Sequence, residues 1–146
     1  MPEREAAPDT PGRVVALDYG SGRCGVAVSD PTRTLASPLE PVRRPATRKG
    51  FNRLLAAVRA QEPALVIVGL PLSLSGSDTA QTTETREFAA RLSGFVAAPV
   101  ELYDERFTTR MAQQRAGSAA EDSRAAAVLL EGWLQRESRF GADRAI

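Results

Sequence analysis

Residues 13–29 have the sequence RVVALDYGSGRCGVAVS. Two mainly apolar runs, residues 13–18 and 24–29, flank a turn that contains several glycines, and this pattern predicts an antiparallel hairpin. The first run ends in Asp18, an acidic residue at the end of an otherwise apolar strand. A glycine-rich turn lets backbone N–H groups approach phosphate oxygens while a neighbouring carboxylate holds a metal ion. The stretch therefore indicates a site for phosphate chemistry.

The rest of the chain predicts alternating helices and strands. An irregular or edge strand is expected over residues 35–42, because Pro38 and Pro41 interrupt it. An amphipathic helix follows over residues 48–61, and the continuous apolar run at 64–70 is typical of a parallel strand buried on both faces. The remaining expected elements are a helix at 79–92, a strand at 99–104, and helices at 108–115 and 118–135. This order predicts an α/β fold with a mixed central sheet flanked by helices.

The composition is that of one compact domain. The chain has 146 residues, of which 42% are hydrophobic and 25% charged. Residues 1–12 lack apolar periodicity and are expected to form a disordered leader, residues 13–136 the domain, and residues 137–146 a C-terminal tail. No apolar run is long enough to cross a bilayer, so no membrane partner is expected. The single cysteine, Cys24, fits a reducing compartment, and a cytoplasmic location is expected.

The absence of histidine restricts the chemistry. Without it, a Ser-His or Cys-His nucleophile pair and a His-ligated zinc site are both excluded. The net charge is only +1, so the chain as a whole does not attract nucleic acid, and any such contact must come from local basic patches.

Three carboxylates occupy positions where a charge is costly unless a cation meets it. Asp18 and Glu105 each follow an apolar strand, and Asp122 lies on the apolar stripe of the last predicted helix. If they converge, the expected partner is Mg²⁺ or Mn²⁺ and the expected chemistry is phosphodiester hydrolysis. Each has an alternative role: a turn hydrogen bond for Asp18, a surface ion pair for Glu105, and a helix cap for Asp122. Asp104 precedes Glu105, and alternation along a strand predicts that only one of the two faces the site.

Four blocks of sequence together resemble one family. They are ALDYGSGRCGVAV at 16–28, VIVGLPL at 66–72, DERFTT at 104–109, and Asp122-Ser123 ahead of AAAVLL at 125–130. In this order they resemble the YqgF (RuvX) family, pre-16S ribosomal RNA nucleases related to Holliday junction resolvases. The resemblance spans roughly residues 13–136. It implies an RNase H-like fold, a cytoplasmic role in 16S rRNA processing, and a divalent metal held by Asp18, Glu105 and Asp122.

Five further residues are candidates for substrate binding. Gly20, Gly22 and Arg23 belong to the glycine-rich hairpin, Arg106 follows Glu105, and Ser73 begins a polar loop expected to close over substrate.

The chain also departs from the family pattern. Gly22 and Ser73 replace a usual Lys and a frequent Asn, and the usual basic stretch before Asp122 is missing. A cluster of five basic residues is a candidate replacement, and an alternative interpretation is a solvated helix start: Arg43, Arg44, Arg48, Lys49 and Arg53.

The function that the sequence favours is a metal-dependent endo- or exonuclease acting on the 16S rRNA precursor. One alternative is a non-catalytic RNA- or protein-binding factor with its carboxylates in structural roles. Another is a resolvase of branched DNA, which needs two sites in a dimer; the sequence leaves open a monomer or a homodimer. The hairpin also occurs in actin-like ATPases, but 146 residues cannot supply their two lobes.

Overall fold

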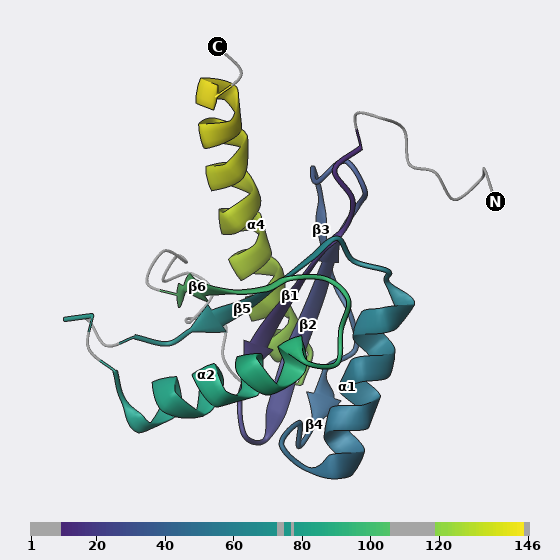
Figure 1. Cartoon of the computed structure of the whole chain (residues 1–146), viewed down its shortest axis with the longest axis vertical. Helices are drawn as coiled ribbons and strands as arrows, with labels where there is room; N and C mark the ends of the chain where they lie inside the picture. Colours follow the sequence, from purple (N-terminus) through teal and green to yellow (C-terminus); the bar gives the residue numbers. More distant parts are fainter. Residues whose placement is uncertain (1–9, 73–74, 77, 106–118, 145–146) are drawn as a thin grey trace.

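The computed structural model describes residues 10–72, 75–76, 78–105 and 119–144. These residues form a mixed sheet with helices on both of its faces (Figure 1). The predicted α/β class with a mixed central sheet is therefore confirmed. None of the described helices combines the length and the hydropathy that a membrane span requires.

The sheet has the strand order β3-β2-β1-β5-β6, and β4 also pairs with β2. The strands are β1 (Val14–Tyr19), β2 (Arg23–Ser29), β3 (Ala36–Pro38), β4 (Val42–Arg43), β5 (Leu65–Leu70) and β6 (Val100–Asp104). β1 and β2 form the predicted antiparallel hairpin, with Tyr19 opposite Cys24. β5 runs parallel to β1 and to β6, and all of its residues are buried, as its apolar run predicts.

The strand expected over residues 35–42 is divided into two. β3 ends at Pro38, the N–H of Leu39 still donates a 2.8 Å hydrogen bond to the carbonyl of Val26 in β2, and strand pairing with β2 resumes at Val42, after Pro41. A proline has no N–H to donate to a neighbouring strand, and Pro41 lies in the gap between the two short strands.

The helices α1 (Arg48–Ala60) and α2 (Ala80–Ser93) lie on one face of the sheet, and α4 (Ala119–Arg144) lies on the other (Figure 1). Alternate residues of β1 enter the two resulting cores. Val15, Leu17 and Tyr19 pack with apolar residues of α1 and α2, whereas Val14 and Ala16 pack with those of α4. The even-numbered positions of β1 therefore face α4.

α4 is longer than the sequence predicted. The helix was expected to end at residue 135, but it continues to Arg144 and projects past the sheet (Figure 1). No proline follows residue 135, and a single glycine inside a helix costs only about 1 kcal/mol. The helix expected at 108–115 lies outside the described residues.

Candidate functional site

Asp18 lies near the end of β1, at the end of the sheet where the parallel strands β1, β5 and β6 all finish; this is called the carboxyl end below. Its neighbour Tyr19 is buried on the opposite face and stacks on Phe88 of α2, with ring centroids 4.3 Å apart. Because successive side chains of a strand alternate, this anchoring directs Asp18 toward the α4 face. The residue paired with Asp18 is Gly25, which places no side chain beside the carboxylate.

Glu105 directly follows β6 at the same end of the sheet. Burial of its side chain, together with the charges of Asp18 and Asp104, raises the pKa of Glu105 to about 7 from an ordinary 4.5. The influence of Asp18 on this pKa means that the two predicted ligands from different strands lie near each other. The sequence left open whether Asp104 or Glu105 faces this region. Both side chains are half-buried, and Glu105 is the one whose pKa is raised by burial and by the charge of Asp18.

Gly69, near the end of β5, leaves room for the Glu105 side chain. A Cβ atom at position 69 would lie 2.9 Å from Cγ of Glu105 and 3.1 Å from both its Cδ and Cδ2 of Leu129. These separations are shorter than ordinary van der Waals contacts, so any larger residue would displace the carboxylate or α4. The glycine thus forms a cradle for a buried acidic side chain.

Asp122 lies in the first turn of α4, and its side chain is outside the described part of the structure. The next residue, Ser123, is buried, and its hydroxyl accepts a 3.3 Å hydrogen bond from the N–H of Val26 in β2. This bond ties the start of α4 to the hairpin that carries Asp18. Further along the helix, Ala126 and Leu129 are buried against the sheet, as the predicted apolar stripe requires.

The donor chemistry of this region suits a hard divalent cation. Buried carboxylates that repel one another are costly, and oxygen ligands are those that Mg²⁺ and Mn²⁺ prefer. Among the residues whose side chains are described, no group of three His, Cys, Asp or Glu is placed to hold a metal ion. Asp18 and Glu105 are two of the three expected ligands, and the side chain of the third, Asp122, is outside the described residues.

The candidate substrate-binding residues fall into two groups. Gly20, Gly22 and Arg23 belong to the hairpin between β1 and β2, and Arg23 is exposed. The carbonyl of Gly22 accepts a 2.9 Å hydrogen bond from the N–H of Arg44, which joins this hairpin to the chain after β4. Ser73 and Arg106 lie outside the described residues.

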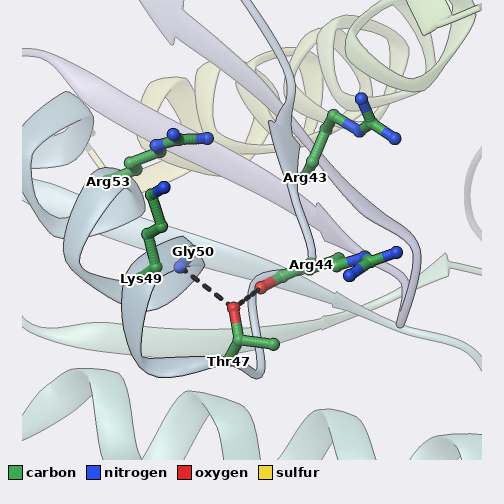
Figure 2. Close-up of a pocket in the computed structure, with 6 residues that line it drawn as sticks. All are labelled: Arg43, Arg44, Thr47, Lys49, Gly50 and Arg53. Carbon is green, nitrogen blue, oxygen red and sulfur yellow. Dashed lines mark hydrogen bonds between the residues drawn. The ribbon is translucent and has the colours of Figure 1, made fainter.

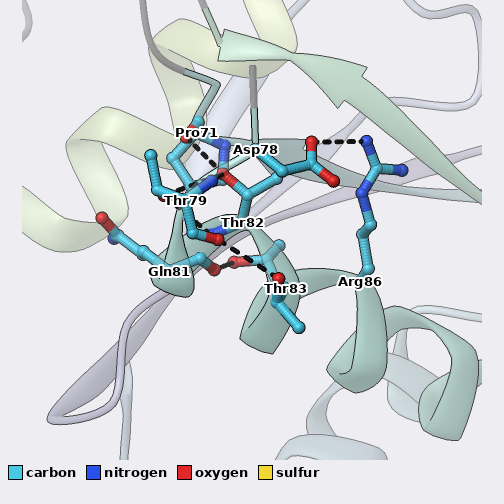
Figure 3. Close-up of polar contacts among 8 residues, drawn as sticks. Pro71, Asp78, Thr79, Gln81, Thr82, Thr83 and Arg86 are labelled. Carbon is cyan, nitrogen blue, oxygen red and sulfur yellow. Dashed lines mark hydrogen bonds and ion pairs between the residues drawn. The ribbon is translucent and has the colours of Figure 1, made fainter.

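One positioning contact was not predicted from the sequence. Thr79 and Thr82 form a capping box that starts α2, and the Thr82 hydroxyl also donates a 2.9 Å hydrogen bond to the carbonyl of Pro71 (Figure 3). The contact ties α2 to the segment that leaves β5 at the carboxyl end. The signal in the sequence is weak, because Thr82 stands where a capping box usually has Glu or Gln. In the same view, Arg86 pairs with Asp78 at 3.1 Å.

Comparisons with known proteins find relatives over most of the chain. The model of the RuvX family, described as Holliday junction resolvase, matches residues 12–136. A Koribacter versatilis protein named "Putative pre-16S rRNA nuclease" is 38% identical over 143 residues, which cover 91% of each chain. A Mycolicibacterium smegmatis protein of the same name is 39% identical and covers 99% of this chain and 94% of its own.

The solved structures support the fold. Thermus thermophilus RuvC has a TM-score of 0.56 with this chain at 16% identity, and the match covers 88% of this chain and 96% of RuvC. RuvC in complex with a Holliday junction substrate gives a TM-score of 0.55 at 17% identity, with the same coverage of both chains. The predicted RNase H-like arrangement is therefore confirmed.

Proposed function

Because this chain belongs to the RuvX family of phosphodiester-cleaving nucleases, we propose that it processes the 16S rRNA precursor in the cytoplasm with the help of a divalent metal ion. The observation that carries the proposal is the meeting of Asp18 and Glu105 at the carboxyl end of the sheet, with Gly69 leaving room for the Glu105 carboxylate. Relatives named for pre-16S rRNA support the choice of substrate.

In this proposal Asp18, Glu105 and Asp122 hold one or two Mg²⁺ or Mn²⁺ ions. When bound, such an ion lowers the pKa of the attacking water and stabilises the charge on the leaving oxygen. Glu105 must lose its proton to act as a ligand, and the pKa of about 7 makes this loss pH-dependent in the absence of a cation. Arg23, exposed beside the glycine-rich turn, would contact the phosphate and orient the scissile bond.

The test is cleavage of a labelled RNA that contains the 5′ end of the 16S precursor, with Mg²⁺, with Mn²⁺ and with a chelator. Asp18→Asn keeps the size of the side chain and removes its charge, and Glu131→Gln, an exposed site on α4, serves as the matched control. We expect metal-dependent cleavage that falls by about 100-fold or more in Asp18→Asn and is unchanged in Glu131→Gln. Equal cleavage by both variants would remove Asp18 from the mechanism.

The description of the matching family model makes branched DNA a second candidate substrate. A four-way DNA junction is therefore assayed beside the precursor RNA. Cleavage of the junction in preference to the RNA would assign the chain to resolution of branched DNA. RNA binding without cleavage under any metal condition would favour the non-catalytic binding factor.

A further inference from the structure

The positive charge of this chain is concentrated in one segment. Residues 41–61 contain six of the 19 basic residues and none of the 18 acidic ones, although the whole chain has a net charge of only +1. The segment includes β4, the turn after it and all of α1. Acidic residues therefore outnumber basic ones in the rest of the chain, and the segment is a local region of positive potential.

Four of these cations line one pocket. Arg43, Arg44, Lys49 and Arg53, together with Thr47 and Gly50, surround a cavity of about 510 Å³ between β4 and α1 (Figure 2). All four cationic side chains are exposed. Across the part of the chain that the structure describes, none of the four side chains makes a hydrogen bond or an ion pair. Their charges are therefore available to an anion from solution.

The arrangement costs stability when no anion is present. Arg23 and Arg43 are directly paired across β2 and β4, and like charges in such a pair repel. Lys49 and Arg53 are four residues apart on α1, which places two further like charges side by side on one helix face (Figure 2). A bound polyanion would relieve the repulsion between Lys49 and Arg53, whereas a purely structural role for these residues would be better served by neutral side chains.

Backbone contacts hold the pocket in one shape. Gly50 is buried so closely that a Cβ atom there would lie 1.9 Å from the carbonyl oxygen of Arg44, a separation that only glycine avoids. The Thr47 hydroxyl donates a 2.7 Å hydrogen bond to that same carbonyl and accepts one of 3.1 Å from the N–H of Gly50 (Figure 2). Because Thr47 already uses the Gly50 N–H, the attraction for an anion comes from the side chains and not from the end of the helix.

The pocket continues the surface that begins at the catalytic carboxylates. Arg23 and Ala27 share a face of β2, and Ala27 packs on the α4 side, so Arg23 lies on the same face as Asp18. Arg43, paired with Arg23, lies on that face as well, two strands or about 10 Å from β1. Lys49 and Arg53 lie on α1, which covers the opposite face of the sheet. A nucleic acid strand that places a phosphate at Asp18 can thus continue over Arg23 and Arg43 and pass around the edge of the sheet at β4 to reach Lys49 and Arg53.

We infer that this pocket binds the phosphate groups of the RNA strand that flanks the cleaved bond, without reading its bases. The pocket lining has four cations and no aromatic side chain on which a base would stack. Phosphate contacts of this kind are independent of sequence and weaken as salt is added, because bound counterions are released. The choice of RNA rests on the proposed function, whereas recognition of phosphate rests on the pocket itself.

The test is binding of the labelled precursor RNA to the full chain in a chelator, across a range of salt concentrations. The variant is Arg44→Gly/Arg53→Gln. Arg44 has a φ of +49°, in the left-handed region that glycine adopts freely, so the first change removes a cation and relieves backbone strain. Arg53 is exposed on a helix, where Gln is well tolerated.

A charge-matched control is Arg59→Gln/Arg86→Gln. Arg59 lies at the other end of α1, where it donates to the carbonyl of Phe95, and Arg86 pairs with Asp78 on α2. Neither residue lines the pocket.

We expect the pocket variant to bind RNA roughly 25-fold more weakly at about 0.1 M salt, with a slope of log K against log salt that is smaller by about 1.4, since each single-strand phosphate contact contributes about 0.7. The control variant should show a much smaller loss of RNA affinity and a much smaller change in the salt slope. Equal losses in the two double variants, or no binding by the wild-type chain at low salt, would overturn the inference.

Two other outcomes are distinguishable. Basic residues also protect exposed strand edges from pairing, so a pocket variant that self-associates but binds RNA normally would assign the cations to that role instead.

The binding assay requires no catalysis, so it tests the pocket separately from the proposed function. If the wild-type chain fails to cleave RNA but the pocket variant still loses affinity for RNA, the proposed function is wrong and the inference about the phosphate pocket is supported. If the wild type cleaves RNA and the pocket variant binds it normally, the inference about the pocket is wrong and the proposed function is unaffected.

Discussion

At the scale of single residues, the surroundings of Glu105 change the pKa of its carboxyl group. Burial is the largest cause of its raised pKa, and the charges of Asp18 and Asp104 add to it. A buried carboxylate among other carboxylates favours its protonated form until a cation arrives. The same feature that prepares the site for a metal therefore makes the metal-free protein less stable at high pH.

The first prediction concerns this pH dependence. Because the folded pKa of Glu105 is about 7 and lies above the ordinary 4.5, the folded state binds this proton more tightly than the unfolded chain does. The free energy of unfolding of the metal-free protein therefore falls as the pH rises from about 4.5 through about 7. In a chelator at about pH 8, Glu105→Gln should be more stable than the wild type by up to about 3 kcal/mol, and the difference should narrow toward about pH 5. Urea denaturation across this range measures it. Glu101→Gln, at an exposed position of β6, should not reproduce the gain.

The second prediction concerns the cradle. Gly69→Ala would place a methyl group 2.9 Å from the Glu105 side chain, so the carboxylate must move. We expect cleavage to fall by about 100-fold, since a displacement of about 1 Å at a reacting centre has this effect, and stability to fall by about 1–3 kcal/mol. Gly94→Ala is the control, because its new Cβ would meet only the Arg91 carbonyl, at 3.5 Å. Normal cleavage by Gly69→Ala would show that Glu105 is not held where the proposal requires it.

At the scale of elements, α2 and β5 are joined by a side chain and not only by the loop between them. The Thr82 hydroxyl bonds both to the start of its own helix and to the Pro71 carbonyl. Thr82 is fully buried, so the loss of its hydroxyl would leave these backbone groups without a partner.

The third prediction follows from this contact. Thr82→Val preserves the shape of the side chain but should cost about 1–3 kcal/mol of unfolding free energy. Thr83→Val is the matched control on the next residue of the helix. Among the described residues, the Thr83 hydroxyl bonds to the Thr79 carbonyl alone, and Thr83 is exposed, so the loss of this hydroxyl should cost less than about 0.5 kcal/mol. Thermal or urea denaturation compares the two. Equal costs would mean that the link to Pro71 contributes nothing.

At the scale of the whole molecule, the net charge is only +1, but the negative and positive charges are concentrated in different regions. Carboxylates gather at the carboxyl end of the sheet, and cations gather beside it around β4 and α1. A divalent cation at the first region and a phosphate strand at the second would each relieve repulsion that the unliganded fold contains. Both ligands should therefore stabilise the native state, by an amount that rises with the logarithm of their concentration once it exceeds the dissociation constant.

The fourth prediction is a thermal shift with metal. At a Mg²⁺ or Mn²⁺ concentration about 100 times its dissociation constant, the native state should gain about 2.7 kcal/mol, which raises Tm by roughly 5–10 °C for a chain of this size. Asp18→Asn should lose most of this shift. NaCl at the same ionic strength separates specific binding of the divalent ion from general screening of charge. An identical shift in the wild type and in Asp18→Asn would exclude Asp18 as a ligand.

Local sequence patterns by themselves determined the hairpin, the buried strand β5 and the apolar stripe of α4, because each depends on periodicity or glycine placement within a few residues. The split of residues 35–42 also followed from local chemistry, through Pro38 and Pro41. Only the tertiary structure brought Glu105 near Asp18, since strand pairing between β1, β5 and β6 aligns residues that are far apart in the chain. It alone set Arg43 beside Arg23 and closed the basic pocket against α1. Proximity across a sheet is fixed by strand order and register, which no short stretch of sequence contains.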